Sequence, residues 1–289
     1  MGNYNNLADE YFCRSSATLE ICAGEIGLTE KQRIELDGYI KRNLDFANGV
    51  PKVNPLTDIM VAKMKALIDK QNNPELPDGA KTHCKKWLNE KLYNRRPKIK
   101  SKYIDKGNET EEDGFTLMAL ELNLGMVYKN TKYYKDAYKH GTPDLVLSKV
   151  YDNKSSWSLD TFPMWETELP DEKYEWQINS YCSLVGLEDG VVVYTLIDAD
   201  KKTVEREIRW CESPDEAYLK TMNLVYTKSY FEELKAELFP LSDLDCFVEI
   251  PQADRKKEFN IKLDPKKIEM IHTRVEMCRA YINELLKNK

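Results

Sequence analysis

The sequence predicts an α/β protein with a mixed sheet flanked by helices, and two observations lead to this class. Residues 1–100 carry mostly helical apolar spacing, whereas after Pro97 the pattern runs helix–β–β–helix–β–β before further helices. Apolar residues make up 42% and charged residues 32% of the 289 residues, so a sizeable core can be buried beneath a strongly charged surface.

Charge and composition exclude several other classes. The net charge of −6 argues against wholesale electrostatic binding to nucleic acid or to an anionic membrane, although it leaves room for a local basic track. No apolar run approaches the roughly 20 residues of a membrane helix, and the N-terminus lacks the pattern of a secretory signal. The seven scattered cysteines fit reduced thiols better than a disulfide framework. We therefore expect a soluble, cytoplasmic protein.

The first hundred residues are expected to be helical. Thr29 and Gln32 have the spacing of a capping box at the start of a helix. Apolar periodicity predicts further helices at about residues 57–71 and 79–93, separated by Pro and Asn clusters. Nothing in this region has the pattern of a catalytic site.

Both kinds of element are expected after Pro97, and glycines mark where two of the helices end. In order, the predicted elements are a helix at 107–124 closed by Gly125, strands at 145–147 and 150–152, a helix at 171–185 ended by Gly186, strands at 191–197 and 203–208, and helices at 214–239 and 264–289. The apolar run at 191–197 indicates a buried strand, and the alternation at 203–208 indicates a partner that is exposed on one face.

Three charged residues on or beside the first two strands carry the chemical prediction. Asp152 and Lys154 are two residues apart, so on a strand they share a face. A three-residue hairpin loop would place Asp144 directly opposite Asp152, whereas a two-residue loop would send the two aspartates to opposite faces. Because paired carboxylates need a shared role, we expect a three-residue loop or a bulge here.

A hard divalent cation would remove the repulsion between two such carboxylates, since Mg²⁺ binds through one or two carboxylates and keeps other positions for water and phosphate. The carbonyl oxygen of Asn153 could supply a further ligand. Lys154 could orient or deprotonate the attacking water, or stabilise the charge that develops on a phosphate. Two acids and a lysine around a metal amount to a site for phosphodiester hydrolysis.

Two helices are expected to complete this site. Glu111 stands at the N-terminal end of a mostly apolar stripe, and Glu112 fits a neighbouring stripe almost as well, so periodicity alone leaves both open. Gln177 and Tyr181 are four residues apart and share a helix face. Their amide and phenol could hold the attacking water, a metal ligand or the nucleic-acid backbone.

These residues fall into motifs. Gly141-Thr-Pro-Asp144, Asp152-Asn-Lys154 and Gln177-Ile-Asn-Ser-Tyr181 resemble the P-D, D/E-x-K and Q-x-x-x-Y motifs of the PD-(D/E)XK nuclease superfamily. The resemblance is greatest to its RecB-like and lambda-exonuclease-like branch, which bacteriophages encode. Residues 102–111 resemble that branch's first motif, a glycine four residues before a metal-binding glutamate, and this favours Glu111 over Glu112. Four motifs in the family's order, over roughly residues 100–210, make the resemblance specific.

The resemblance implies a restriction-endonuclease-like fold, with a mixed central sheet flanked by helices, a helical N-terminal region and C-terminal helices. Residues 1–100 would form the N-terminal region, packed on the core, and residues 101–289 the nuclease core with its C-terminal helices. Carried over by motif, one or two Mg²⁺ or Mn²⁺ ions would be held by Glu111, Asp144, Asp152 and the Asn153 carbonyl. Lys154 would be catalytic, with Gln177 and Tyr181 supporting the site. The cysteines include no C-x-x-C pair, which argues against the iron–sulfur cluster of some relatives.

The implied function is a metal-dependent DNA nuclease, most directly an exonuclease of phage recombination. An endonuclease of the same fold and a non-catalytic nucleic-acid-binding recombination protein are the alternatives. The implied partners are DNA and a phage single-strand annealing protein, in the host cytoplasm, and a homo-oligomer stays open. A basic run at residues 85–102 is a candidate track for DNA phosphates, although a solvated linker face would have the same charge; its DNA-contacting candidates are Arg95, Arg96, Lys98, Lys100 and Lys102.

Overall fold

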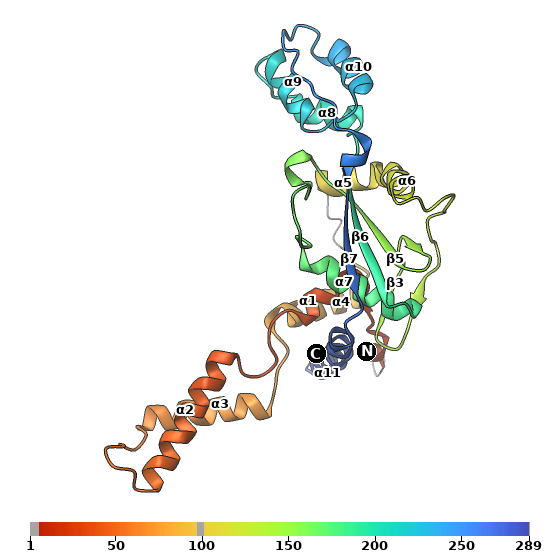
Figure 1. Cartoon of the computed structure of the whole chain (residues 1–289). Coiled ribbons are helices and arrows are strands. Elements are labelled where there is room, and N and C mark those ends of the chain that lie inside the picture. The colour runs from red at the N-terminus through yellow and green to blue at the C-terminus, as the bar shows by residue number, and fades with distance from the viewer. Residues whose placement is uncertain (1–5, 97–100, 289) are drawn as a thin grey trace. The chain divides into compact units, whose positions relative to one another are not determined.

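The computed structural model describes residues 6–96 and 101–288, and the chain divides into two compact units (Figure 1). The first unit comprises the residues up to Cys13, Ala17–Arg95 and the residues from Glu269 onward, and the second comprises Arg14–Ser16 and Arg96–Ile268. Most of the last helix therefore belongs to the first unit, whereas the sequence had grouped it with the core. Within the described residues, no helix combines the length and the apolar character needed to cross a membrane.

The first unit is helical. Its helices are α1 Thr18–Cys22, α2 Glu30–Ala47, α3 Asp58–Asn72, α4 Asp78–Tyr93 and most of α11 Pro265–Lys287. The predicted capping box is confirmed, because the Thr29 hydroxyl accepts from the Gln32 N–H and the Gln32 side chain accepts from the Thr29 N–H. α2 and α3 pair as a hairpin (Figure 1), and the side chains of Leu28, Leu36 and Leu67 are buried together there.

The second unit contains both sheets. It includes Arg14 of the short strand β1 Cys13–Arg14. Its other elements, in chain order, are α5 Lys102–Glu109, α6 Glu111–Glu121, β2 Tyr134–Lys135, β3 Lys139–Gly141, β4 Leu145–Val146, β5 Val150–Ser155, α7 Glu172–Val185, β6 Asp189–Thr195, α8 Lys201–Ile208, α9 Pro214–Met222, α10 Lys228–Leu238 and β7 Lys256–Lys262. The larger sheet has the order β4-β5-β6-β7, and the smaller one β1-β3-β2. β5 and β6 are parallel, whereas β4 and β7 are antiparallel to their neighbours. The expected mixed central sheet is confirmed.

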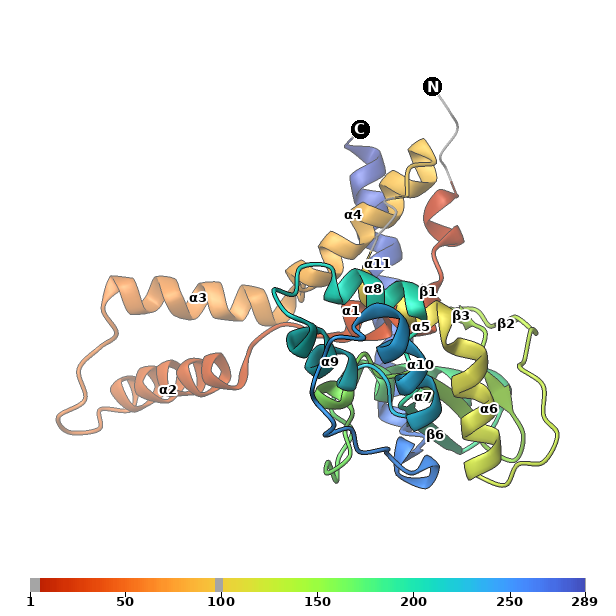
Figure 2. The ribbon, with the colours of Figure 1, turned by 90° about the horizontal axis from the view of Figure 1, so that it is seen from above.

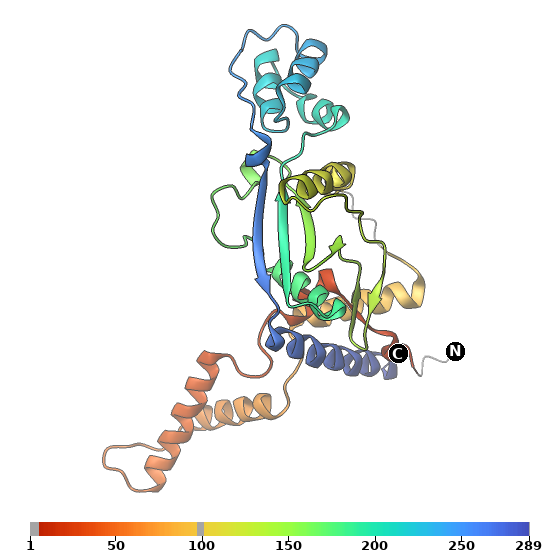
Figure 3. The same cartoon turned by 45° about the vertical axis from the view of Figure 1, so that its right-hand side comes forward.

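Helices cover both faces of the larger sheet (Figures 2 and 3). On one face, Val150, Val192 and Tyr194 pack with Ile178 and Cys182 of α7. On the other face, Tyr151, Val191 and Val193 pack with Met118 of α6. Alternate residues of one strand thus enter different layers, which is the pleat of a sheet buried on both sides. The polar end of β5 lies between these two helices.

One predicted strand is wrong. Residues 203–208 lie in helix α8, because the Asp200 side chain accepts from the Thr203 N–H and caps a helix start. The antiparallel partner of β6 is instead β7, in which Phe259 and Ile261 alternate into the core. That segment had received no prediction, although its alternation is visible in the sequence.

Two predicted helices are each divided. The helix expected at 107–124 breaks at Thr110, whose hydroxyl donates back to the Lys106 carbonyl, and this separates α5 from α6. The helix expected at 214–239 is α9 and α10, because the Asp198 carboxylate accepts the N–H groups of Tyr226 and Thr227 between them. The first interruption thus involves a local side-chain hydrogen bond, and the second involves an aspartate distant in sequence.

Candidate active site

Asp144 and Asp152 face each other at the start of the β4–β5 hairpin. Leu145 pairs with Tyr151 and Val146 with Val150, which leaves residues 147–149 as a three-residue loop. Continuing this register by one residue places Asp144 opposite Asp152. The predicted loop length is therefore confirmed. The Asn153 N–H also donates to Asp144 Oδ2 at 2.8 Å, which fixes the Asp144 side chain against β5.

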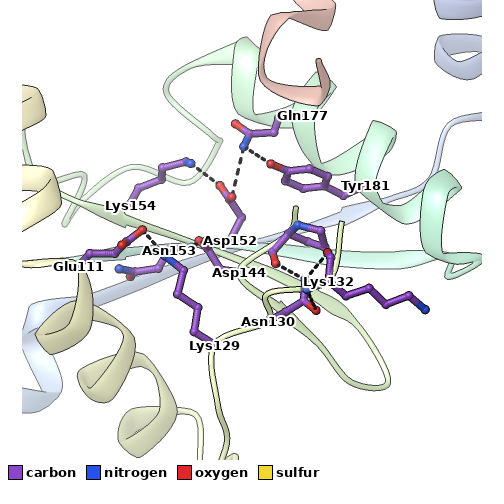
Figure 4. Close-up of polar contacts among 11 residues, drawn as sticks. Glu111, Lys129, Asn130, Lys132, Asp144, Asp152, Asn153, Lys154, Gln177 and Tyr181 are labelled. Carbon is purple, nitrogen blue, oxygen red and sulfur yellow. Dashed lines mark hydrogen bonds and ion pairs between the residues drawn. The ribbon is translucent and has the colours of Figure 1, made fainter. Parts of the chain in front are cut away.

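Lys154 extends over the same face of β5 as Asp152. Its Nζ lies 2.6 Å from Asp152 Oδ2 (Figure 4) and 4.8 Å from the centroid of the Tyr174 ring. The Asp152 side chain is 3% exposed and that of Lys154 21% exposed, so the ion pair is largely removed from water. Burial acts to lower the pKa of Lys154, but the charge of Asp152 and the contact between the two groups outweigh it and raise this pKa above its ordinary value.

The ionised form of Asp144 is electrostatically unfavourable without a bound cation. Burial, followed by the negative charge of Asp152, raises the pKa of Asp144 to about 6, and the charges of Lys154 and Lys129 offset this only in part. The ionised form of Asp144 is therefore disfavoured beside the Asp152 carboxylate. A positive charge placed between them would relieve the conflict.

Helix α7 holds the buried side of this pair. Gln177 Nε2 donates to Asp152 Oδ1 at 3.3 Å and to Tyr181 Oη at 3.0 Å (Figure 4). Burial, and then the charge of Asp152, raise the pKa of Tyr181 to about 12, so its phenol stays protonated. The Asp171 side chain caps the N-terminus of α7, and Gly186 ends the helix in the left-handed conformation at φ +76°.

The first residue of the Gly-Thr-Pro-Asp motif, Gly141, lies where a side chain would clash with its neighbours. A Cβ at this position would lie 2.5 Å from Tyr181 Cε1 and 2.7 Å from Ser15 Oγ. Ser15 Oγ donates to the His140 carbonyl, and Ser180 Oγ donates to Ser15 Oγ. The glycine therefore lets α7 approach the strand that leads into Asp144.

Helix α6 lines the opposite, more exposed side. Glu111, its first residue, is 51% exposed and forms an ion pair with Lys129, whose Nζ also lies 4.0 Å from Asp144 Oδ1. Glu112 is exposed, and its main-chain carbonyl accepts from Thr116 in the next turn. The Lys129 ammonium therefore connects Glu111 to Asp144.

Asn153 takes part through its backbone. Its side-chain Oδ1 accepts from Thr195 Oγ1 at 3.0 Å, on the face covered by α6. Its N–H points toward Asp144. In a strand the N–H and C=O of one residue lie on the same edge, so the Asn153 carbonyl belongs to the Asp144 edge as well. The side chain and the carbonyl thus serve different neighbours.

The donor set fits a hard divalent cation, although it is not assembled as a cage. Among residues 6–96 and 101–288, no group of three or more His, Cys, Asp or Glu side chains is arranged to hold a metal ion. Asp144 and Asp152 converge, whereas the ammonium of Lys129 lies beside both Glu111 and Asp144. Asp152 is buried and Asp144 is part-buried, and burial together with the charge of Asp152 raises the pKa of Asp144. Two such carboxylates match the small number of protein ligands that Mg²⁺ takes.

Several contacts of the site were not predicted from the sequence. Lys129 and Asn130 lie in an unpatterned segment between α6 and β2, where no periodicity marks them. Asn130 N–H donates to the Asp144 carbonyl at 2.7 Å, and Asn130 Nδ2 donates to the Pro143 carbonyl at 2.9 Å. Tyr174, one turn before Gln177 on α7, packs its ring against the Lys154 ammonium.

The basic residues at 85–102 differ in their surroundings. Arg95 and Arg96 are exposed. Lys102 donates to Glu207 at 2.7 Å, and its Nζ lies 4.7 Å from the Trp157 ring centroid. The predicted DNA contacts Lys98 and Lys100 lie outside the described residues.

The fold matches that of solved exonucleases. The crystal structure of a phage-related exonuclease from Haemophilus somnus 129PT is similar with a TM-score of 0.61 at 18% identity, covering 98% of this chain and 99% of that one. An alkaline exonuclease from Laribacter hongkongensis is similar with a TM-score of 0.51 at 11% identity, covering 98% and 94%. No protein-family model and no curated protein matches the sequence. At these identities the likeness shows that the fold is shared.

Proposed function

We propose that this protein is a metal-dependent DNA nuclease, and most specifically an exonuclease of phage recombination. One observation carries the proposal: Asp144 and Asp152 face each other in register, with the Lys154 ammonium 2.6 Å from Asp152. The fold shared with two exonucleases over 98% of the chain supports it. The P-D, D-x-K and Q-x-x-x-Y motifs supply these same side chains.

Asp144, Asp152 and the Asn153 carbonyl would hold the metal, and Glu111 would join them once Lys129 moves away. When bound, Mg²⁺ or Mn²⁺ would supply positive charge to the phosphate oxygens and make a bound water more acidic. The chain itself prepares this position. Gln177 orients Asp152 through Oδ1, and the Asn153 N–H orients Asp144 through Oδ2.

Lys154 would act on the substrate as a fixed cation. Its ammonium is held between the Asp152 carboxylate and the face of the Tyr174 ring, so few of its rotamers remain. From there it would orient the attacking water and offset the negative charge that builds up on the phosphate. Tyr181 would act one step further back, by fixing Gln177.

Cleavage assays on linear and covalently closed circular DNA distinguish this proposal from an endonuclease and from a non-catalytic protein. We expect the purified protein to release nucleotides from linear duplex DNA with Mg²⁺, to leave covalently closed circles intact, and to stop when EDTA is added. Asp152→Ala should be inert and Lys154→Ala should be slower by about 100-fold or more, whereas Lys262→Ala, an exposed lysine on β7, should behave as wild type.

Cleavage of closed circles would favour the endonuclease. A wild type as inert as its variants on every DNA form would remove the enzyme proposal and favour a nucleic-acid-binding protein. A host-cytoplasmic location, an annealing-protein partner and a homo-oligomer follow only from the family resemblance, and fractionation, co-purification and light scattering would test them.

A further inference from the structure

The segment between α6 and β2 has an unusual composition. Residues 126–135 contain three lysines and three tyrosines but no acidic residue, in a chain whose acids outnumber its bases by 49 to 43. The segment has no regular structure until β2 begins at Tyr134. We call residues 126–135 the tyrosine–lysine loop.

The tyrosine–lysine loop is fixed beside the aspartate pair. Asn130 donates to the carbonyls of Pro143 and Asp144, and its side chain also accepts the Lys132 N–H at 3.0 Å (Figure 4). Lys129 forms its ion pair with Glu111 from the same loop. The main-chain position of the loop is thus set by the motif that carries Asp144.

The side chains that do not anchor the loop are open to solvent. Met126 is 88% exposed, Tyr128 79% and Tyr133 57%. The Tyr128 hydroxyl lies 3.5 Å from the Met126 Sδ. The Lys132 side chain points away from the aspartates (Figure 4), and its Nζ lies 4.7 Å from the Tyr134 ring centroid. Aromatic faces and an ammonium are therefore presented together, next to the candidate site.

This arrangement suits one kind of ligand. Aromatic rings that alternate with cations bind single-stranded nucleic acid, because each base offers a face for stacking and each phosphate a charge for lysine. The interior of a duplex keeps its bases stacked on one another, so such a surface favours an unpaired end. The polar groups of Asn130 are already used in anchoring, which leaves stacking and charge to bind the strand without reading its sequence.

We propose that the tyrosine–lysine loop binds the unpaired end of the DNA strand that enters the site, with Tyr128 as the stacking platform and Lys132 as a phosphate contact. The proposal rests on the proposed nuclease function, because it concerns how that function's substrate reaches Asp144 and Asp152. It assigns DNA binding to residues outside the basic run at 85–102.

Binding measured without cleavage tests this loop directly. Fluorescence anisotropy of a labelled single-stranded oligonucleotide, in EDTA and at low salt, would compare wild type with Tyr128→Ala, Tyr128→Phe and Lys132→Ala. Loss of one stacking face should weaken binding by about 5-fold or more, and phenylalanine should restore it. Lys132→Ala should reduce the slope of log K against log salt by about 0.7, the value for one phosphate contact on a single strand. A blunt duplex should bind more weakly than the single strand and be less affected by Tyr128→Ala.

Two exposed residues of the same unit serve as controls: Trp210→Ala, which is 82% exposed after α8, and Lys262→Ala on β7. Both should bind the single strand as wild type does. Wild-type affinity in Tyr128→Ala, an equal loss in Trp210→Ala, or no binding of the single strand by wild type would each overturn the proposal. The proposed nuclease function fails separately, if the protein binds through this loop yet releases no nucleotide with Mg²⁺.

Discussion

The two sides of the Asp144–Asp152 pair differ in how firmly they are held. On the α7 side, Gln177, Tyr181 and Asp152 are buried and joined by hydrogen bonds, and Gly141 allows the helix to pack closely. On the α6 side, Glu111 is 51% exposed and Lys129 39% exposed, and a single ion pair connects them. The buried side is therefore suited to fix the chemistry, and the exposed side to rearrange when metal and DNA arrive.

The largest difference between the two sides should appear in the rate of cleavage. Lys154→Ala removes a charge held next to the reacting phosphate and should lower the rate by about 10²- to 10³-fold, the cost of losing one preorganised donor. Glu111→Gln removes a carboxylate that is half exposed, and we expect a loss about ten times smaller than that of Lys154→Ala. Initial rates at saturating Mg²⁺ measure both. Equal losses would show that the exposed side is as essential as the buried one.

Adding one methyl group at Gly141 should disrupt the packing on the buried side. Gly141→Ala places a Cβ 2.5 Å from Tyr181 Cε1, and this overpacking should lower the free energy of unfolding by about 1–3 kcal/mol. Gly107→Ala in α5 meets no heavy atom within 4 Å and should instead gain about 0.5–1 kcal/mol as an ordinary helical site. Urea unfolding of both variants gives the comparison. A neutral Gly141→Ala would mean that α7 is not held against this strand.

The burial of Asp144, together with the nearby charge of Asp152, predicts a dependence of stability on pH. Because the pKa of Asp144 is raised to about 6, the folded chain binds more protons at this site than the unfolded chain between about pH 4 and pH 6. Its contribution to the free energy of unfolding therefore falls as the pH rises through this window, and the deficit is complete above pH 6.

In EDTA, Asp144→Asn should accordingly be more stable than wild type at pH 8, by on the order of 1–2 kcal/mol, and equally stable near pH 4. Asp254→Asn, at an exposed aspartate, should show no such pattern. Thermal unfolding across this pH range measures the difference. A variant that is less stable at pH 8 would show that Asp144 is stabilised, rather than strained, without metal.

The smallest effect is expected on the exposed side. Lys129→Gln frees Glu111 and Asp144 from a competing cation, and an exposed ion pair contributes about 0.2–1 kcal/mol. The Mg²⁺ concentration for half-maximal activity, and the midpoint of Mg²⁺ binding by calorimetry, should therefore fall by about 1.5- to 5-fold. A higher Mg²⁺ requirement would mean that Lys129 assists the bound state instead of competing with it.

The buried side was the more predictable from sequence. Period-two spacing put Asp152 and Lys154 on one face, the carboxylate argument set the hairpin loop, and the four-residue spacing joined Gln177 to Tyr181. Each inference concerned near neighbours in the chain. The motifs then supplied what spacing alone left open, which was the choice of Glu111 over Glu112.

The rest depended on contacts between distant segments. Lys129 and Asn130 reach Asp144 from a loop without periodicity, so no local pattern marks them. Residues 203–208 were predicted as a strand because apolar and polar residues alternate there, but Asp200 caps a helix start and the segment forms α8. β7 is separated from β6 by three helices, and its pairing could be inferred only from the two buried residues that alternate within it.

The central claim is that Asp144 and Asp152 share one divalent cation. A crystal soaked in Mn²⁺, with anomalous scattering recorded, tests it most directly. The account predicts an anomalous peak within coordination distance of a carboxylate oxygen of each aspartate, with the Lys129 ammonium withdrawn from Asp144. A fully soaked crystal with no peak between these carboxylates, or with Lys129 still in place there, would contradict it.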